Sequence, residues 1–340
     1  MISVRRAEIK DIPMIMQFLD EHWLKGYALA HNRELFEWQF VKNGKVNIAI
    51  AVDEENEKMY GMEGAIAYSG DEAPHISSCL WICEKTNNPT LSLEITEAAY
   101  KMMNASGSYG LGLLKDAIRV HKLLKHDIMY MDHYYRLRQK DKYVIAKIEE
   151  PIIPPITDYG WYLEEIDSLE EIKEVISTNT LNQHVPRKDC EYISWRYLEH
   201  PVFKYYVWKI CNPKKEAKSI IVTREENYNG SKSCKIVDFY GDDKDFIFAS
   251  YALDSLMSER DYEYIDIYSV GFPKEIYDSA GFVECSENSR NIIPNHFQPY
   301  SCENSRIALV DIHYDRLRMF RGDSDQDKPR LTIQWRKNDD

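Results

Sequence analysis

An internal repeat limits the folds open to this chain. Residues 34–43 (ELFEWQFVKN) resemble residues 191–201 (EYISWRYLEHP), with Trp38 and Trp195 coinciding. From this anchor the same order of elements follows twice, at an offset of roughly 157 to 161 residues. Each copy has two strands joined by a turn, an apolar strand, an amphipathic helix, a short segment, a further helix and a last strand. The shared order predicts a duplicated α+β unit.

The repeat also predicts where the domains begin and end. The apolar strands 75–86 and 234–243 precede the amphipathic helices 90–103 and 245–259. The strand at 129–137 (MYMDHYYRL) is expected to end the first copy. The proline-rich residues 149–160 (EEPIIPPITDYG) predict a linker. We therefore expect an N-terminal domain at residues 1–148 and a C-terminal domain at residues 161–340, which ends in an acidic tail.

Charge and apolar content exclude several classes of partner. The chain of 340 residues carries 56 acidic and 43 basic residues, a net charge of -13, so a nucleic acid is not expected as a partner. A small anionic substrate needs only a local positive site. No apolar run reaches the roughly 20 residues of a membrane-spanning helix, and the N-terminal residues lack a signal-peptide core. We expect a cytoplasmic protein without membrane insertion.

No metal site is predicted. The seven cysteines are scattered without a C-x-x-C pair, which is typical of reduced thiols. Residues 323–327 (DSDQD) begin like a calcium loop, but Lys328 stands where such a loop has glycine and Gln334 where it has glutamate.

Residues 277–282 (YDSAGF) carry a more specific pattern. This segment and the order of elements resemble the GNAT superfamily of N-acyltransferases, in which Tyr-x-x-x-Gly-Phe is typical. The resemblance implies two tandem GNAT-like domains, each a mixed, mostly antiparallel twisted sheet flanked by helices. It implies acetyl-CoA or another acyl-CoA as co-substrate, and it implies that Tyr277 protonates the thiolate leaving group. A role of Tyr277 as a core residue is the alternative.

The glycine-rich loop that holds the coenzyme pyrophosphate in this family is missing from both copies. In the first copy the corresponding residues are Lys85, Thr86, Asn87 and Asn88. They precede a proline at a helix start, where capping side chains and one positive charge could hold phosphates. A capped surface helix without a ligand is the alternative. In the second copy, three aspartates around the helix start would repel a pyrophosphate.

Asp238 and Tyr240 alternate with apolar residues and should share one face of their strand. In GNAT enzymes an acidic residue near this position often removes the amine proton. The resemblance therefore implies a catalytic role for Asp238, with Tyr240 beside it, and a structural hydrogen bond is the alternative.

Residues with a recognition character gather around the second tryptophan. Arg196 offers a planar fork for a phosphate or carboxylate, and Trp195 offers an apolar face on which a sugar can stack. With His200 and Asn295 they form the predicted substrate site, although core and turn positions would also suit them.

A narrower resemblance suggests the substrate. Residues 194–205, 292–299 and 321–330 are similar to tandem GNAT-like proteins of bacterial surface-polysaccharide gene clusters. This implies transfer of an acyl group, most simply acetyl, to an amino group of a nucleotide- or carrier-linked sugar. Two alternatives stay open: transfer of an aminoacyl or other acyl group from a non-CoA donor, as in FemAB-type proteins, and a non-catalytic binding protein on a degenerate GNAT fold. The catalytic domain and the oligomeric state also stay open.

Overall fold

The computed structural model describes residues 1–181, 183–295, 303–311, 316–324 and 327. They form two compact units, Met1–Leu111 and Gly112–Asp327, each built on its own sheet.

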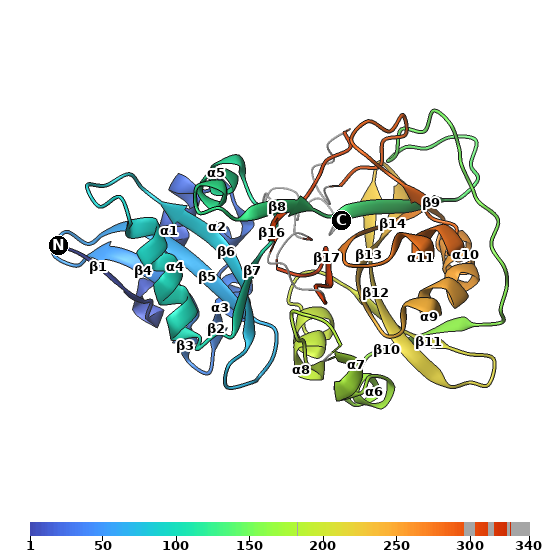
Figure 1. The fold of residues 1–340 in the computed structure, drawn as a ribbon, viewed down its shortest axis with the longest axis horizontal. Coiled ribbons are helices and arrows are strands. Elements are labelled where there is room, and N and C mark those ends of the chain that lie inside the picture. Colours follow the sequence, from blue (N-terminus) through green and yellow to red (C-terminus); the bar gives the residue numbers. More distant parts are fainter. Residues whose placement is uncertain (182, 296–302, 312–315, 325–326, 328–340) are drawn as a thin grey trace. The chain divides into compact units, whose positions relative to one another are not determined.

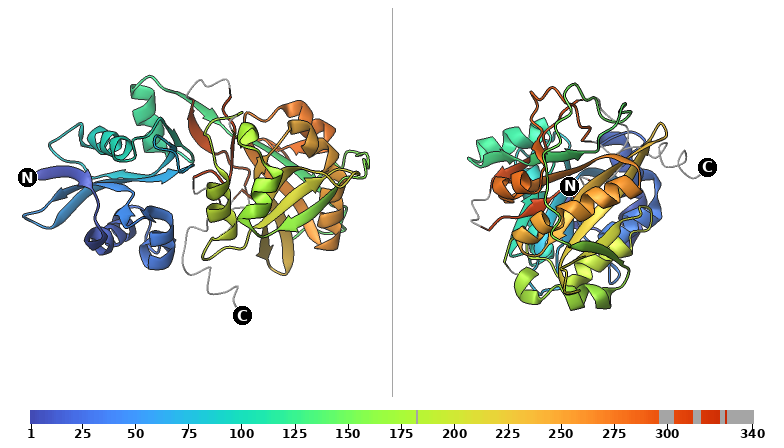
Figure 2. Two further views of the ribbon diagram at one scale, coloured as in Figure 1. Left: turned by 90° about the horizontal axis from the view of Figure 1, so that it is seen from below. Right: turned by 90° about the vertical axis from the view of Figure 1, so that its right-hand side faces the viewer.

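The first unit holds a five-stranded sheet in the order β1-β4-β5-β6-β7 (blue to teal in Figure 1). Helix α4 contacts β1, β4, β5 and β6 on one face, and α1 and α3 contact β5 on the other (Figure 2). The elements are β1 (Ile2–Arg6), η1 (Ile9–Asp11), α1 (Ile12–His22), α2 (Ala28–His31), α3 (Arg33–Phe40), β2 (Val41–Lys42), β3 (Lys45–Val46), β4 (Ile48–Asp53), β5 (Lys58–Ala67), β6 (His75–Cys83), α4 (Leu91–Met102) and β7 (Gly107–Gly110).

Helix α4 lies very close to the sheet. Its residues Leu91, Ile95 and Ala99 recur at helical spacing and pack on small alanines of β4. A Cβ at Gly61 would lie 2.7 Å from Ile95 Cδ1 and 2.8 Å from the carbonyl oxygen of Ile82. The helix can approach the sheet this closely because β4 and β5 present alanine and glycine to it.

Glu63 on β5 is a buried carboxyl in this unit. It accepts hydrogen bonds from Ser78 Oγ at 2.5 Å and from Thr96 Oγ1 at 2.6 Å. Burial raises the pKa of Glu63 above its usual value, and the two hydroxyl groups lower it by less.

Glu63→Gln is expected to stabilise the protein at neutral and alkaline pH. Because the pKa of Glu63 is raised on folding, the folded state binds this proton more tightly than the unfolded chain. Stability is therefore lost as the pH rises from the unfolded pKa through the folded one. The neutral amide escapes this loss, so the melting temperature should rise by a few degrees at pH 8, as about 1 kcal/mol would produce. The gain should disappear near pH 4, and an equal gain at both pH values would contradict the prediction.

The second unit holds a larger sheet in the order β10-β11-β12-β13-β14-β9-β15, and β17 also pairs with β14. Helices α9, α10 and α11 cover one face of it (Figure 1). The elements are α5 (Lys115–Leu123), β8 (Asp127–Tyr130), β9 (Asp132–Leu137), β10 (Tyr162–Ile166), α6 (Leu169–Val175), α7 (Thr178–Leu181), α8 (Cys190–Ile193), η2 (Ser194–Leu198), β11 (Tyr206–Cys211), β12 (Ala217–Tyr228), β13 (Ser231–Tyr240), α9 (Asp243–Phe248), α10 (Ser250–Glu259), β14 (Tyr262–Val270), α11 (Lys274–Ser279), β15 (Val283–Glu284), β16 (Ala308–Asp311) and β17 (Met319–Phe320). Within the part of the chain that the structure describes, we find no helix long and apolar enough to cross a bilayer.

The two sheets confirm the predicted duplicated α+β fold. Each sheet has four consecutive antiparallel strands, β1-β4-β5-β6 in the first unit and β10-β11-β12-β13 in the second. The fourth of these strands then pairs in parallel with the next strand: β6 with β7, and β13 with β14. Both β6 and β13 carry a bulge, where pairing shifts between Met62 and Gly64 in one unit and between Val222 and Thr223 in the other.

Strand β9 differs from the sequence prediction, which assigned residues 129–137 to the end of the first domain. It pairs instead with β14, from Asp132 opposite Ser269 to Leu137 opposite Tyr264, and it also pairs with β15. The pairing covers an edge of β14 that would otherwise present unpaired backbone groups. Residues 149–160, predicted as a linker, contain no helix or strand and belong to the second unit.

A segment near the C-terminus, residues 316–324, enters the same sheet, and we call it the C-terminal arm. Pairing between β13 and β14 ends at Ile236 opposite Ile267. Beyond that point, Ser269 of β14 pairs with Phe320 of the arm. The N–H of Gly322 donates to the carbonyl of Val237 at 2.8 Å. The arm therefore lies between β13 and β14 where these strands separate.

Candidate functional site

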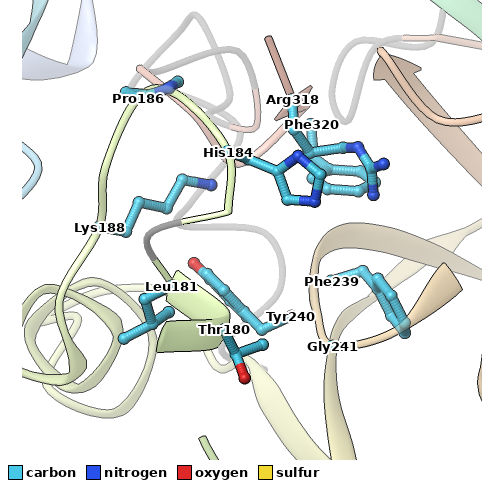
Figure 3. Close-up of a pocket in the computed structure, with 10 residues that line it drawn as sticks. All are labelled: Thr180, Leu181, His184, Pro186, Lys188, Phe239, Tyr240, Gly241, Arg318 and Phe320. Carbon is cyan, nitrogen blue, oxygen red and sulfur yellow. The ribbon is translucent and has the colours of Figure 1, made fainter. Parts of the chain in front are cut away.

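A pocket lies at the end of β13 in the second unit, beside the arm (Figure 3). The residues that line it are Thr180, Leu181, His184, Pro186, Lys188, Phe239, Tyr240, Gly241, Arg318 and Phe320. They come from α7, from the loop that follows it, from the end of β13 and from the arm.

The bulge in β13 determines which side chains reach this pocket. Ile236 and Phe239 both lie in the core beneath the helices, which regular alternation of side chains would forbid. The extra residue of the bulge allows it. Asp238 and Tyr240 consequently share the opposite face, where the Tyr240 hydroxyl donates to Asp238 Oδ2 at 2.5 Å.

Asp238 is fully buried and its carboxylate is saturated with hydrogen bonds. Lys188 Nζ donates to both oxygens, at 2.9 and 3.1 Å. The Tyr197 hydroxyl donates at 2.7 Å and the N–H of Phe239 at 3.0 Å, in addition to Tyr240. Five hydrogen bonds use the roughly four lone-pair sites of a carboxylate. Asp238 therefore holds Lys188 and two tyrosines in position.

Lys188 links this carboxylate to the arm. Its Nζ lies 2.7 Å from Asp323 Oδ1 and above the Tyr240 ring, 5.1 Å from the centroid. Burial lowers the pKa of Lys188, but the carboxylates of Asp238 and Asp323 outweigh it and raise the pKa above its usual value. The side chain is a fixed positive charge that borders the pocket.

Asp323 comes from the motif DSDQD, at the far end of the arm. Burial has the largest effect on the pKa of Asp323 and raises it, and the nearby Asp238 carboxylate raises it further. Lys188 lowers the pKa by less, so that the result is a pKa of about 6. The N–H of Phe320 donates to its second oxygen at 2.8 Å. The last residue of the motif, Asp327, pairs with Arg196. Asp323 and Asp327 thus serve as ion-pair partners within the second unit.

Two more groups that can carry positive charge line the pocket. Arg318 Nη1 lies 2.8 Å from Asp243 Oδ1, and its Nε donates to the carbonyl of Gly271 at 2.9 Å. His184 is half-buried. Burial, and next the guanidinium of Arg318, lower the pKa of its imidazole.

Tyr277 lies elsewhere, in the core beneath the helices. Its ring stacks on Tyr134 at 4.1 Å between centroids, and its hydroxyl lies 2.5 Å from Ser269 Oγ. It is fully buried, which raises its pKa above the usual range, and it does not line the pocket. Of the three predicted catalytic residues, the structure brings Asp238 and Tyr240 together.

The four predicted substrate-binding residues do not line this pocket. Arg196 is buried, with Asp327 and the Tyr205 hydroxyl as partners. Nδ1 of His200 accepts from the N–H groups of two residues that follow it. Asn295 accepts from Arg321 at 3.0 Å and donates to Ser305. Trp195 is half-buried, with its ring centroid 5.8 Å from that of Tyr192.

The predicted coenzyme loop of the first unit is ordered by its own side chains. Thr86 Oγ1 accepts from the N–H of Asn88, and Asn88 Oδ1 accepts from the N–H of Thr90. Asn88 and Thr90 both donate to Glu94. Lys85 and Asn87 are exposed. Because these backbone donors are engaged, a pyrophosphate would have to displace the capping contacts.

In the second unit, Asp242 caps α9 by accepting from the N–H of Lys244, and Asp243 pairs with Arg318. These carboxylates occupy the positions at which a phosphate would approach. Among the described residues there is no group of three or more histidine, cysteine, aspartate or glutamate side chains suited to a metal ion.

No family model and no curated protein matches this chain. Among solved structures it is similar to a conserved protein of unknown function from Enterococcus faecalis, described as a probable N-acyltransferase. That match has 8% identity and a TM-score of 0.56 and covers 91% of this chain and 72% of the other. A GCN5-related N-acetyltransferase from Anabaena variabilis has 9% identity, a TM-score of 0.54 and the same coverages, 91% and 72%. The chain therefore has the fold of GNAT-type proteins in two GNAT-like domains.

Lys188, His184 and Arg318 are pocket residues that the sequence analysis missed. They lie in irregular segments far apart in the chain, and neither segment belongs to the repeat. One signal was available: the acidic motif at 323–327 requires cationic partners if it is buried, and the run HVPRKD at 184–189 supplies one.

Proposed function

We propose that this protein is an acyltransferase that moves an acyl group, most simply acetyl, from acyl-CoA to an amino group of a nucleotide- or carrier-linked sugar. Its place would be in surface-polysaccharide biosynthesis in the cytoplasm. The observation that carries the proposal is the pocket at the end of β13, where Lys188, Tyr240 and His184 meet beside the bulge. The GNAT fold supports acyl transfer, and the ring of Tyr240 offers a face for a sugar.

In this proposal Asp238 positions Lys188 and Tyr240 in the second unit. Residues 85–88 are proposed separately as a phosphate site of the first unit. Exposed Lys85 supplies positive charge there, and the contacts of Asn88 would have to open. Those contacts also favour a second candidate function, acyl transfer from a donor other than CoA, because such a donor needs no pyrophosphate loop.

The test is to incubate the protein with acetyl-CoA and a set of free and nucleotide-linked amino sugars. Release of the CoA thiol and acylated product by mass spectrometry are the measurements. Product from an aminoacyl or other donor, but none from acetyl-CoA, would favour the second candidate. No product from any donor would contradict both.

Two tyrosine variants should separate the site from the core. Tyr240→Phe removes a hydroxyl beside the pocket and is expected to lower turnover at least tenfold. Tyr277→Phe leaves Ser269 without its buried partner and is expected to cost about 1–3 kcal/mol of stability, with turnover within about twofold of wild type. Loss of turnover in Tyr277→Phe at an unchanged melting temperature would instead support its role as proton donor.

A further inference from the structure

His184 stands in a backbone segment that the C-terminal arm holds in place. The N–H of Val185 donates to the carbonyl of Arg316 at 2.9 Å, and the N–H of Arg318 donates to the carbonyl of Val185 at 2.8 Å. These bonds join the loop to the arm directly beside the histidine. Figure 3 shows the imidazole ring on the side of Arg318 and Phe320, and the end of Lys188 and the Tyr240 hydroxyl on the other side of the view.

The imidazole is held as a proton acceptor. It makes a hydrogen bond to the backbone at Arg316. In the neutral ring one nitrogen donates, and when that donor is used on a carbonyl the other nitrogen is an acceptor. Burial, Arg318 and Lys188 lower the pKa of His184, while Asp243 and the bond to Arg316 raise it by less. These groups together favour the neutral ring.

The two cations that line the pocket, Lys188 and Arg318, are paired with carboxylates that lie outside its lining. Three carboxylates, Asp238, Asp323 and Asp243, surround two cations, Lys188 and Arg318, through ion pairs of 2.7 to 2.9 Å. When all three carboxylates are ionised, they exceed the cations by one negative charge. The paired carboxylates offset the positive charge of the lining, so the net charge does not exclude an amine acceptor.

We propose that this pocket receives the acceptor's amino group and that His184 is the general base that removes its proton. The proposal rests on the proposed acyl transfer. Asp238, the expected base, has both oxygens fully engaged, whereas His184 borders the pocket with an acceptor nitrogen.

The ammonium group gives one proton to the imidazole, and the nitrogen lone pair forms a bond to the acyl carbon of the donor. The bond from that carbon to the leaving group breaks. The leaving group keeps the electron pair and takes the second proton from the nitrogen. The imidazolium then releases its proton to solvent.

The first test uses His184→Gln, which can still donate to Arg316 but cannot accept a proton at neutral pH. With the acyl-transfer assay, kcat is expected to fall by about 10²–10⁴-fold, and the acidic limb of the kcat/KM pH profile should be lost. Added imidazole should partly restore turnover in His184→Gly. His126→Gln, at an exposed position of the same unit, is the matched control. A His184→Gln enzyme with turnover within about threefold of wild type and an unchanged pH profile would overturn the inference and leave the acyl-transfer proposal standing.

The second test needs no acyl donor. Glucosamine is titrated into the full chain while the histidine ring signals are followed by NMR, with His184→Gln identifying the relevant signal. The expected result is a shift of the His184 signal and a lower titration midpoint, because a neighbouring ammonium disfavours a second cation. No change at His184 would overturn the amine subsite. A shift without product from any donor would retain the amine subsite and reject the proposed acyl transfer.

Discussion

Lys188→Met is expected to lower the melting temperature by roughly 6–20 °C. The substitution removes the cation that lies 2.9 Å from Asp238 and 2.7 Å from Asp323, both of which are fully buried. Removing one member of a buried ion-pair network costs about 3–5 kcal/mol, because the remaining charges stay buried without compensation. In a unit of this size each kcal/mol corresponds to about 2–4 °C. Thermal unfolding followed by circular dichroism measures the change.

The pH dependence of this loss provides its own check. Asp323 already has a pKa of about 6 with Lys188 present, and removing the cation should raise it further. Folding then favours the protonated carboxyl, so the destabilisation should be largest above pH 7 and smaller at pH 5.

Two further variants control for the loss of a lysine as such. Lys188→Met/Asp323→Asn removes one uncompensated charge and should recover part of the lost stability. Lys244→Met, at an exposed lysine of the same unit, should stay within about 0.5 kcal/mol of wild type. Equal melting temperatures for Lys188→Met and Lys244→Met would contradict the buried network.

The architecture was predictable from the sequence because each strand and helix has a recognisable local periodicity, and because the same order of elements occurs twice. Trp38 and Trp195 anchored the alignment, and the order of strands and helices that follows them matches the order in both sheets. The alternation of Asp238 and Tyr240 likewise predicted their shared face, and the bulge preserves it because it lies before Asp238.

The partner of a strand edge was not predictable in the same way. Strand β9 has the apolar alternation of a sheet strand whichever sheet it joins, so its sequence specifies the strand and leaves the neighbour open. Its pairing with β14 depends on long-range fit, seen in the stacking of Tyr134 on Tyr277. The same limit applies to the arm, whose two-residue strand β17 is too short to show any periodicity.

The candidate pocket includes Tyr240, which the sequence analysis named, and also His184, Lys188 and Arg318, which lie in two irregular segments and were missed. Arg196 was predicted to bind substrate because a guanidinium binds phosphates and carboxylates equally well. In the structure its carboxylate partner is Asp327 of the same chain. For Tyr277 the Gly-Phe pair that follows it in the sequence marks the end of a helix, and this helix end packs in the core. The residue type limited the interactions that each side chain could make. The residue that it contacts, far away in the sequence, determined which of these interactions it makes in the structure.

Gly271→Ala is expected to displace the C-terminal arm and to reduce both stability and turnover. Gly271 has φ of +74°, and a Cβ there would lie 1.7 Å from the carbonyl oxygen of Leu317. That atom belongs to the arm's backbone and cannot rotate away, so the arm or β14 must shift. The left-handed conformation costs an alanine about 1–2 kcal/mol, and overpacking adds about 1–3 kcal/mol. Because the arm also holds the segment beside His184, turnover should fall with it.

Gly230→Ala separates these two costs. Gly230 lies in the turn between β12 and β13 with φ of +77°, and a Cβ there would meet no atom within 4 Å. It shares the backbone penalty without the clash. The difference in melting temperature between the two variants, expected to be roughly 2–12 °C, therefore measures how tightly the arm packs against β14. If both variants melt at the same temperature, the arm yields at little cost, and the position of His184 cannot depend on it.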